Sequence, residues 1–368
     1  MAAQRSSKKK RRRITTASWN VRSLVEDTGD PRVCRRSSTS HSGVDRKLDL
    51  LADELRVHGI DLAGIQETRW FGNDVWPAGA CTFLHSGRPL PQDGQPARRN
   101  EGVGIFLNAA MTTLWKRGGE QWQAVSSRIV TARLLVGLKG DRIPGGGKRQ
   151  SDFYLSVVNV YAPTSKATLS VKQAFFTDLQ SVVSALPSRD AVVFLGDFNA
   201  HVGSCDNCGH PGSVGADDGG SAWGSVLGRF GLGSCNQAGE ELLLFCATNQ
   251  LSVMNTFFRK RPSTHGTWTH PATQRCHLIE FILMRSSQRR FRRDVRVGRG
   301  ASCWTDHFMV RTTLELDFLV PLHPRLPVQQ RQNLAVHLFH DKATPTTYHQ
   351  EMSLACSGES IYARALAS

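Results

Sequence analysis

The stretch VVFLGDFNAHVG, residues 192–203, decides more about the fold than any other part of the chain. The apolar run that leads into it, residues 191–195, has the length and composition of a buried strand, and Gly196 follows. Asp197 and Asn199 come next, and the two-residue period of a strand places both on one side. The stretch therefore predicts a buried strand that ends in an adjacent carboxylate and amide, with an Asx turn as the alternative.

Other segments repeat this strand composition, and a smaller set has helical periodicity. Strands are predicted at residues 14–21, 61–66, 102–107, 128–137, 153–161, 277–284, 294–299 and 308–316. Helices are predicted at residues 45–59, 171–186 and 239–250. Strands and helices mix without the regular alternation of a parallel sheet, so we expect a layered α/β domain with mixed sheets.

Composition changes mark the limits of this domain. We expect a basic disordered arm at residues 1–13, a domain at residues 14–316 and a C-terminal appendage at residues 317–368. The run RSSKKKRRR within the arm is typical of a nuclear address, of a phosphate-binding arm or of a solvated tail without a receptor. Residues 201–238 are rich in Gly, Ser, Asp and Asn, which predicts a long mobile surface loop.

The balance of charges favours a polyanionic partner. A formal net charge of +15 attracts nucleic acid, and no apolar window is long enough for a membrane helix or a secretory signal. We therefore expect an intracellular protein that binds nucleic acid, and the odd number of cysteines, nine, favours reduced thiols. A zinc site at Cys205 and Cys208, with His201 and His210, is an alternative to incidental loop cysteines.

Polar residues at the ends of predicted strands can carry phosphodiester chemistry. Glu67 follows the apolar run LAGI and can anchor Mg²⁺, although a surface glutamate is the simpler interpretation. Asp197 can activate water, and Asn199 can donate to a phosphate without adding negative charge. Tyr161, at the end of VVNVY, can also donate to phosphate or can line the rim of the core.

A second group of candidates surrounds a histidine near residue 307. Asp306 directly precedes His307 in WTDHFMV, and this imidazole can bind a phosphoryl oxygen or transfer a proton. Glu280 lies inside the apolar run HLIEFILM, where an unpaired charge is costly, so we expect it to contact a cation or a histidine. Asn20 ends the first predicted strand with an amide that can contact metal-bound water or a carboxylate.

Taken in order, the motifs SWNV, QETRW, NVYAPT, GDFNAHVG and TDHFMV resemble those of the endonuclease/exonuclease/phosphatase superfamily. The flanking text, including GSCNQAGEELLLFCATNQLSVMNTFF, resembles non-LTR retrotransposon endonuclease domains and the craniofacial development protein 2 group. The resemblance spans about residues 14–316. It implies a four-layered α/β sandwich, in which two mixed sheets are flanked by helices.

The resemblance also implies roles and a cofactor. It implies one-metal, in-line attack of water on a DNA phosphodiester, leaving a 3′-hydroxyl end, with Mg²⁺ as cofactor and Mn²⁺ as a substitute. No small-molecule cofactor is implied, and the oligomeric state stays open. The implied metal residues are Glu67, Asn20 and Asp306. The implied catalytic residues are Asp197, Asn199, His307, Tyr161 and Glu280, and the implied substrate-binding residues are Arg69, Asn199 and Trp268.

The chain departs from the family pattern at Glu280 and Phe281, where an Asp-Tyr pair is usual. Because an imidazole must be placed closely, the longer carboxylate is expected to lower the rate. Thr305 replaces a usual Ser, and Arg22 replaces the acid of repair-type relatives, which favours the retroelement group.

Function is therefore expected to be DNA nicking in the nucleus. A catalytically weakened DNA- or chromatin-binding protein is the alternative, and a phosphatase of the same superfamily is the third possibility. Arg259, Arg261 and the run 289–293 are expected to contact backbone phosphates. The C-terminal text from residue 326 to residue 353 is similar to the linker that leads into a reverse transcriptase.

Overall fold

The computed structural model describes residues 7–25, 46–91, 100–142, 148–205, 223–261, 264–301 and 303–321. Residues Lys9–Val320 form one compact unit, and the fold and the site lie within it. No helix among the residues described is long and apolar enough to cross a membrane.

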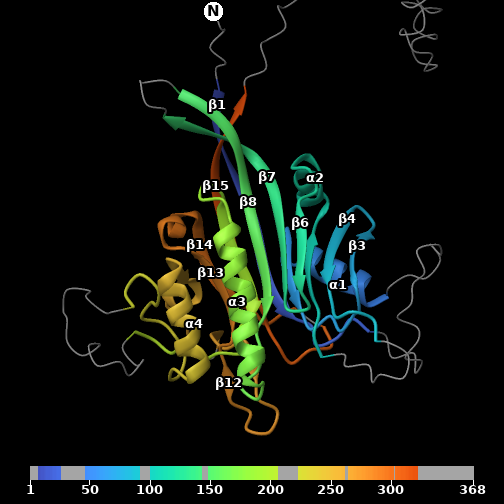
Figure 1. Ribbon diagram of the computed structural model, residues 1–368, viewed down its shortest axis with the longest axis vertical. Coiled ribbons are helices and arrows are strands. Elements are labelled where there is room, and N and C mark those ends of the chain that lie inside the picture. Colours follow the sequence, from blue (N-terminus) through green and yellow to red (C-terminus); the bar gives the residue numbers. More distant parts are fainter. Residues whose placement is uncertain are drawn as a thin grey trace, which may run out of the picture. The chain divides into compact units, whose positions relative to one another are not determined.

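The sheet consists of two mixed halves (Figure 1). The first half has the order β10 (Leu251–Val253), β13 (Glu280–Arg285), β9 (Ala191–Asp197), β8 (Lys148–Tyr161), β7 (Ile129–Arg142) and β6 (Trp122–Ser126). The second has the order β14 (Arg292–Gly298), β15 (Met309–Pro321), β1 (Ser7–Asn20), β2 (Leu62–Gln66), β5 (Val103–Leu107), β4 (Cys81–Ser86) and β3 (Asn73–Ala78). Strands β8 and β9 are parallel, as are β1 and β2, and the pair Leu319 and Leu138 joins the halves.

Four helices accompany these strands in the described part of the chain: α1 (Arg46–Val57), α2 (Ala109–Arg117), α3 (Leu169–Ala185) and α4 (Gln237–Thr248). Short 3-10 helices η1 (Met254–Phe257) and η3 (Ser286–Phe291) lie beside the first half. A small separate hairpin is formed by β11 (Trp268–Thr269) and β12 (Cys276–His277).

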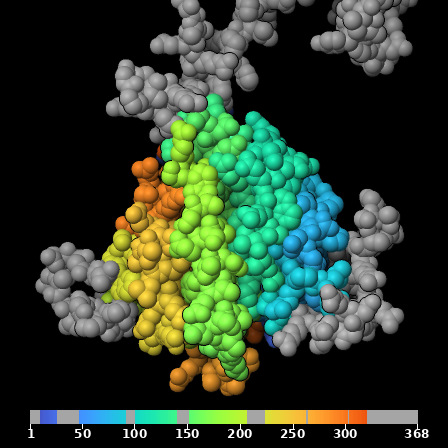
Figure 2. Space-filling view, viewed as in Figure 1, coloured from blue at the N-terminus to red at the C-terminus, as the bar shows by residue number. Residues whose placement is uncertain are grey.

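Alternating side chains of the strands create the layers. In β9, Val193 and Leu195 enter the core between the two halves, whereas Val192 and Phe194 pack outward beneath α3 and α4. These two helices cover the outer face of the first half (Figure 2, green and yellow). Helix α1 covers the other outer face. The order helices, sheet, sheet, helix confirms the predicted four-layered sandwich.

Helix α2 and strands β3, β4 and β6 were not predicted from sequence. Asn108 caps α2 because its Oδ1 accepts from the backbone N–H of Met111 at 2.9 Å, and the helix buries Leu114 and Trp115 in the central core. Strand β3 is an edge strand that contains Pro77, which disfavours a strand by composition. Tertiary packing therefore stabilises these elements where local sequence propensity does not predict them.

The structure corrects both ends of the predicted domain. Strand β1 begins at Ser7, so much of the basic run is strand and not a disordered arm. Arg11 pairs with Asp317 at 2.9 Å and Arg13 with Glu315 at 2.8 Å, because acidic residues of β15 lie opposite these arginines. Strand β15 continues to Pro321, five residues past the predicted boundary at residue 316. The remaining appendage, residues 322–368, lies outside the described residues.

The predicted mobile loop at residues 201–238 is wrong for its described parts. Val202, Trp223, Val226 and Leu227 are buried beneath α3 and α4, because apolar residues recur among the glycines and serines. Residues 206–222, which include Cys208 and His210 of the zinc alternative, lie outside the described residues.

A buried amide fixes the spacing of the halves close to the ends of β2 and β8. Asn159 of β8 donates to the carbonyl oxygens of Ile65 and Gly104, both at 2.8 Å, and accepts from Gln66 Nε2 at 2.6 Å. A Cβ on Gly64 would lie 2.5 Å from Asn159 Oδ1, so glycine is required for this approach. Each half is thereby held against the other by hydrogen bonds as well as by apolar packing.

His85 makes the stability of this domain depend on pH. Its side chain in β4 is buried against Thr68 and Trp70, and burial lowers its pKa to about 3. The unfolded chain binds a proton near pH 6.5 and the folded chain does not, so stability falls as pH drops below 6.5. The expected slope is about 1.4 kcal/mol per pH unit between 6.5 and 3.

Urea unfolding at pH 6.5 and pH 5.5 checks this prediction. The native chain should lose about 1 kcal/mol more stability than His85→Gln over this interval, because glutamine does not take up a proton. His58→Gln, at a partly exposed position directly after α1, is the matched control. Equal losses in the native chain and in His85→Gln would contradict the prediction.

Candidate active site

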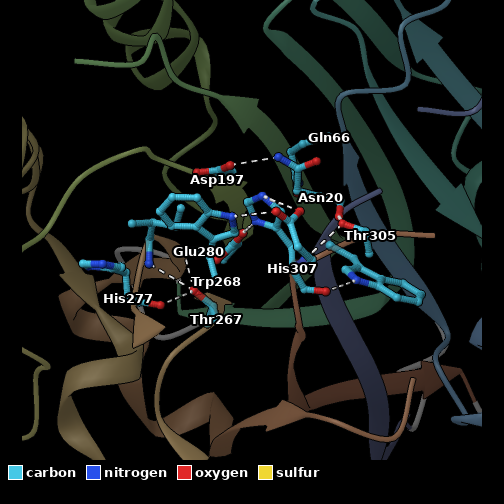
Figure 3. Close-up of polar contacts among 12 residues, drawn as sticks. Asn20, Gln66, Asp197, Thr267, Trp268, His277, Glu280, Thr305 and His307 are labelled. Atoms are coloured by element: carbon cyan, nitrogen blue, oxygen red, sulfur yellow. Dashed lines mark hydrogen bonds and ion pairs between the residues drawn. The ribbon is translucent and has the colours of Figure 1, made fainter. Parts of the chain in front are cut away.

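Polar side chains from both halves gather where their strands end (Figure 3). The second half contributes residues at the ends of β1 and β2 and before β15, and the first half contributes the ends of β8 and β9 and the start of β13. These residues are Asn20, Glu67, His307, Tyr161, Asp197 and Glu280. The structure thus brings together residues that are up to 287 positions apart in the sequence.

The amide of Asn20 connects two carboxylates. Its Nδ2 donates to Glu67 Oε1 at 2.9 Å and to Asp197 Oδ2 at 3.0 Å, while its Oδ1 accepts from the backbone N–H of Arg22. Tyr161 donates its hydroxyl proton to the same Glu67 oxygen at 2.9 Å. Asn20 therefore orients the two carboxylates by hydrogen bonds.

His307 forms an ion pair with Glu280. Its Nδ1 contacts Glu280 Oε1, and Glu280 itself is fully buried. Glu280 also lies directly opposite Asp197 in the antiparallel pairing of β13 and β9. The extra methylene of glutamate, compared with the usual aspartate, thus does not prevent contact with the imidazole.

These neighbours shift the pKa values of His307 and Asp197. Burial alone lowers the pKa of His307, but the charges of Glu280 and Asp197 outweigh it and raise the pKa to about 9. Burial, together with the charge of Glu280, raises the pKa of Asp197 to about 7. Near neutral pH the site therefore contains an imidazolium beside a carboxylate that can accept a proton.

Two buried residues that the sequence interpretation did not include fix Glu280. Asn255 donates to the carbonyl oxygen of Glu280 at 3.0 Å and accepts from the N–H of Ile282 at 2.9 Å. The hydroxyl oxygen of Thr267 accepts from the N–H of Ile279 at 3.0 Å and from that of Glu280 at 3.3 Å. Asn255 lies in the largely apolar segment LSVMNTFF, which was the available signal, whereas the sequence around Thr267 offers none.

Asp306 lies beside this pair and is only partly satisfied. Its Oδ2 accepts from Trp268 Nε1 at 3.1 Å, whereas its Oδ1 has no hydrogen-bond partner among the described residues. Two cationic groups lie near Oδ1: Arg22 Nη1 at 3.5 Å and His307 Nε2 at 3.8 Å. Trp268 also stacks obliquely on His307, with ring centroids 6.0 Å apart.

Strained backbone is concentrated here. Arg22, Glu67, Arg69 and Asn199 all have positive φ, at 59°, 53°, 60° and 47°, which non-glycine residues rarely adopt. Asn199 consequently does not continue the alternation predicted for β9. Its N–H donates to Asp197 Oδ1 at 2.9 Å, which is the Asx turn that the sequence left open.

The predicted substrate-binding residue Arg69 is paired with Glu67. Its Nη2 lies 3.0 Å from Glu67 Oε2, and its side chain is 36% exposed. Arg128, which sequence reasoning missed, lies over the ring of Tyr161, 5.4 Å from its centroid, and donates to the Tyr161 carbonyl at 3.2 Å. Glu101 is buried and pairs with Arg128 at 2.7 Å, so this ion pair holds Tyr161 in place.

The predicted phosphate-binding run at residues 289–293 lies elsewhere. Gln288 accepts from the N–H of Val192, at the start of β9, whereas Asp197 ends that strand. Within the run, Arg289 and Arg292 stack on Phe257 at 5.1 and 5.5 Å. These arginines therefore belong to the opposite end of the first half and not to the candidate site.

Two groups of side chains can hold a divalent cation. Glu67 and Asp306 are one candidate group, because each offers carboxylate oxygen, which suits Mg²⁺, and the Oδ1 atom of Asp306 is buried without a hydrogen-bond partner among the described residues. Asp197, Glu280 and His307 form another, since their ligand atoms all lie within 4.8 Å of one another. In this second group Glu280 already binds His307 Nδ1, and a protonated imidazole opposes a cation. His307 Nε2 also lies 3.8 Å from Asp306 Oδ1, so the charged imidazole opposes a cation in either group.

Comparisons with known proteins agree with this architecture. The sequence pattern of the Endonuclease/Exonuclease/phosphatase family matches residues 17–327. Craniofacial development protein 2 of Bos taurus is 29% identical over 297 residues, which are 78% of this chain and 43% of that protein. The chain therefore spans less than half the length of this relative.

The chain is similar to two solved structures. AP endonuclease LMAP from Leishmania major is 11% identical with a TM-score of 0.51, over 83% of this chain and 88% of that one. The endonuclease domain of TRAS1, a telomere-specific non-LTR retrotransposon, is 13% identical with a TM-score of 0.46, over 82% of this chain and 98% of that one.

The ion pair at His307 can be tested directly. In buffer without divalent cations, NMR of histidine-labelled protein should give a His307 pKa of about 9. In Glu280→Gln the pKa of His307 should fall below about 7, because less negative charge then offsets the lowering of the pKa by burial. Glu54→Gln, which removes the carboxylate beside His58, is the matched control. An unchanged His307 pKa in Glu280→Gln would show that Glu280 does not hold the proton.

Proposed function

Because the chain belongs to the endonuclease/exonuclease/phosphatase family, we propose that it is a Mg²⁺-dependent phosphodiesterase that nicks DNA, with Mn²⁺ as a substitute ion. The observation that carries the proposal is the Asn20 amide, which joins Glu67 to Asp197 beside the buried pair of Glu280 and His307. Phosphodiester hydrolysis needs an anchor for a cation, a group that activates water and a donor for the phosphoryl oxygens. This arrangement supplies all of them within one cluster.

Glu67 and Asp306 are the residues that would hold the ion. When bound, Mg²⁺ neutralises negative charge that develops on the phosphoryl group. Asn20 and Tyr161 both donate to Glu67 Oε1, so they fix the direction in which this carboxylate points. Trp268 fixes Asp306 in the same way through Oδ2.

Asp197 is suited to orient water and accept its proton. Its two oxygens are held by Asn20 and by the N–H of Asn199, and its raised pKa of about 7 matches a base that works near neutral pH. A proton accepted here stays close to the negative charge of Glu280, which favours the protonated form.

His307 is suited to bind or protonate a phosphoryl oxygen. Glu280 occupies its Nδ1 and holds the ring charged, which leaves Nε2 as the donor that remains. Asn199 is a further phosphate donor in this proposal, and Tyr161 becomes one when its single hydroxyl proton leaves Glu67 Oε1. Glu280 therefore positions His307 and does not itself touch the substrate.

DNA is the proposed substrate, bound by Arg69 and Trp268 beside the carboxylates. Arg69 is partly exposed, and the net charge of +15 favours approach of a polyanion. A retroelement origin and a nuclear location complete the proposal, and both rest on sequence resemblance and the basic run.

Nicking of supercoiled plasmid by the purified chain tests the function. We expect nicks with Mg²⁺ or Mn²⁺, none with EDTA, and a loss of at least about 100-fold in Asp197→Ala, since general base catalysis contributes that much. Asp178→Ala, on the surface helix α3, is the matched control and should nick like the native chain.

Glu280→Asp tests whether the longer acid fits. Because Glu280 already contacts His307, the shorter side chain should withdraw from Nδ1 and reduce nicking. A gain in Glu280→Asp from a silent native chain would indicate a decayed enzyme. If neither the native chain nor Glu280→Asp nicks plasmid, the nuclease function is contradicted and a DNA-binding protein or a phosphatase is favoured. Hydrolysis of inositol phosphate substrates would distinguish the phosphatase from the DNA-binding protein.

A further inference from the structure

Arg22 is an arginine at the site to which the proposed mechanism gives no role. It follows β1, its φ of 59° is left-handed, and its N–H is held by Asn20 Oδ1 at 2.9 Å. A left-handed non-glycine residue costs about 1–3 kcal/mol and persists only where its surroundings enforce it. Here the enforced backbone places the side chain, which is 53% exposed, beside Asp306.

The contact between Arg22 and Asp306 is weak. Their closest atoms are 3.5 Å apart, and the Oδ1 atom concerned accepts no hydrogen bond among the described residues. By contrast, Arg69 donates a hydrogen bond to Glu67 at 3.0 Å. Half-exposed ion pairs contribute little to stability, about 0–1 kcal/mol. Arg22 is therefore a loosely held counter-ion that can exchange partners.

We propose that Arg22 is a phosphate-binding residue that Asp306 retains until a divalent cation binds, after which the guanidinium holds a DNA phosphate. The proposal rests on the proposed function, because it assigns Asp306 to the cation. Cation and guanidinium compete for the same carboxylate oxygen. A guanidinium freed from Asp306 matches phosphate oxygens in planar, bidentate geometry, which an ammonium does not.

A consequence is coupling between ion and DNA. If the ion releases Arg22 toward phosphate, it raises the affinity for DNA, and DNA must raise the affinity for the ion by the same factor. An arginine that only stabilises the end of β1 would give no such coupling. The part of the coupling that Arg22→Gln removes separates the proposal from a structural role.

Mn²⁺ binding, followed by electron paramagnetic resonance on the full chain, is the first measurement. Without DNA, Arg22→Gln should bind Mn²⁺ about two- to fivefold more tightly than the native chain, because a competing cation is lost. Arg22→Lys keeps the charge and should resemble the native chain. Arg56→Gln, whose partner Asp53 lies on the surface of α1, is the matched control.

DNA affinity is the second measurement, with a phosphorothioate duplex that resists cleavage. Mn²⁺ should raise the affinity of the native chain, and Arg22→Gln should lose at least about tenfold of that gain, the value of one charge-assisted contact. Arg22→Lys should lie between them. Unfolding midpoints that match the native chain exclude misfolding as the cause.

Distinct outcomes overturn distinct claims. If Arg22→Gln keeps the full Mn²⁺-dependent gain in DNA affinity, Arg22 does not bind phosphate. If the native chain binds no Mn²⁺, both this proposal and the proposed function fail. If Arg22→Gln loses the Mn²⁺-dependent gain but the native chain does not nick plasmid, the role of Arg22 stands and only the nuclease activity is overturned.

Discussion

One amide joins the two halves of the sheet at the candidate site. Asn20, at the end of β1, donates to Glu67 after β2 and to Asp197 at the end of β9. The bond to Asp197 requires strand ends from different halves to stay within hydrogen-bond reach. Asn159 meets that requirement from within the core by binding the backbone of the facing strands. The geometry of the site is thus a consequence of how closely the sheets pack.

The site concentrates charge that would be costly if unpaired. Glu280 and Asp197 lie opposite one another on the paired strands β13 and β9, and His307 beside them carries the compensating proton. Because each group stabilises the charge state of the next, replacing one alters the others. Arg22 and Arg69 supply positive charge at the rim beside Asp306 and Glu67. Carboxylates for a cation and cations for a phosphate therefore occupy the same small volume.

Much of the fold followed from apolar periodicity, because long buried strands and helices carry that signal strongly. Strand β3 and helix α2 did not, since one is an exposed edge and the other depends on tertiary packing. Strand-end polar residues predicted which groups gather at the site. Their orientation could not be predicted: the left-handed backbone of Asn199 and the pairing of Arg69 with Glu67 arise from contacts between distant segments.

The central claim is that Glu67 and Asp306 hold the cation while Asp197, Glu280 and His307 act on water and phosphate. Anomalous diffraction from crystals soaked in Mn²⁺ tests it most directly. The account predicts a manganese peak in contact with Glu67 and Asp306. A peak enclosed by Asp197, Glu280 and His307, whose ligand atoms lie within 4.8 Å of one another, would contradict it.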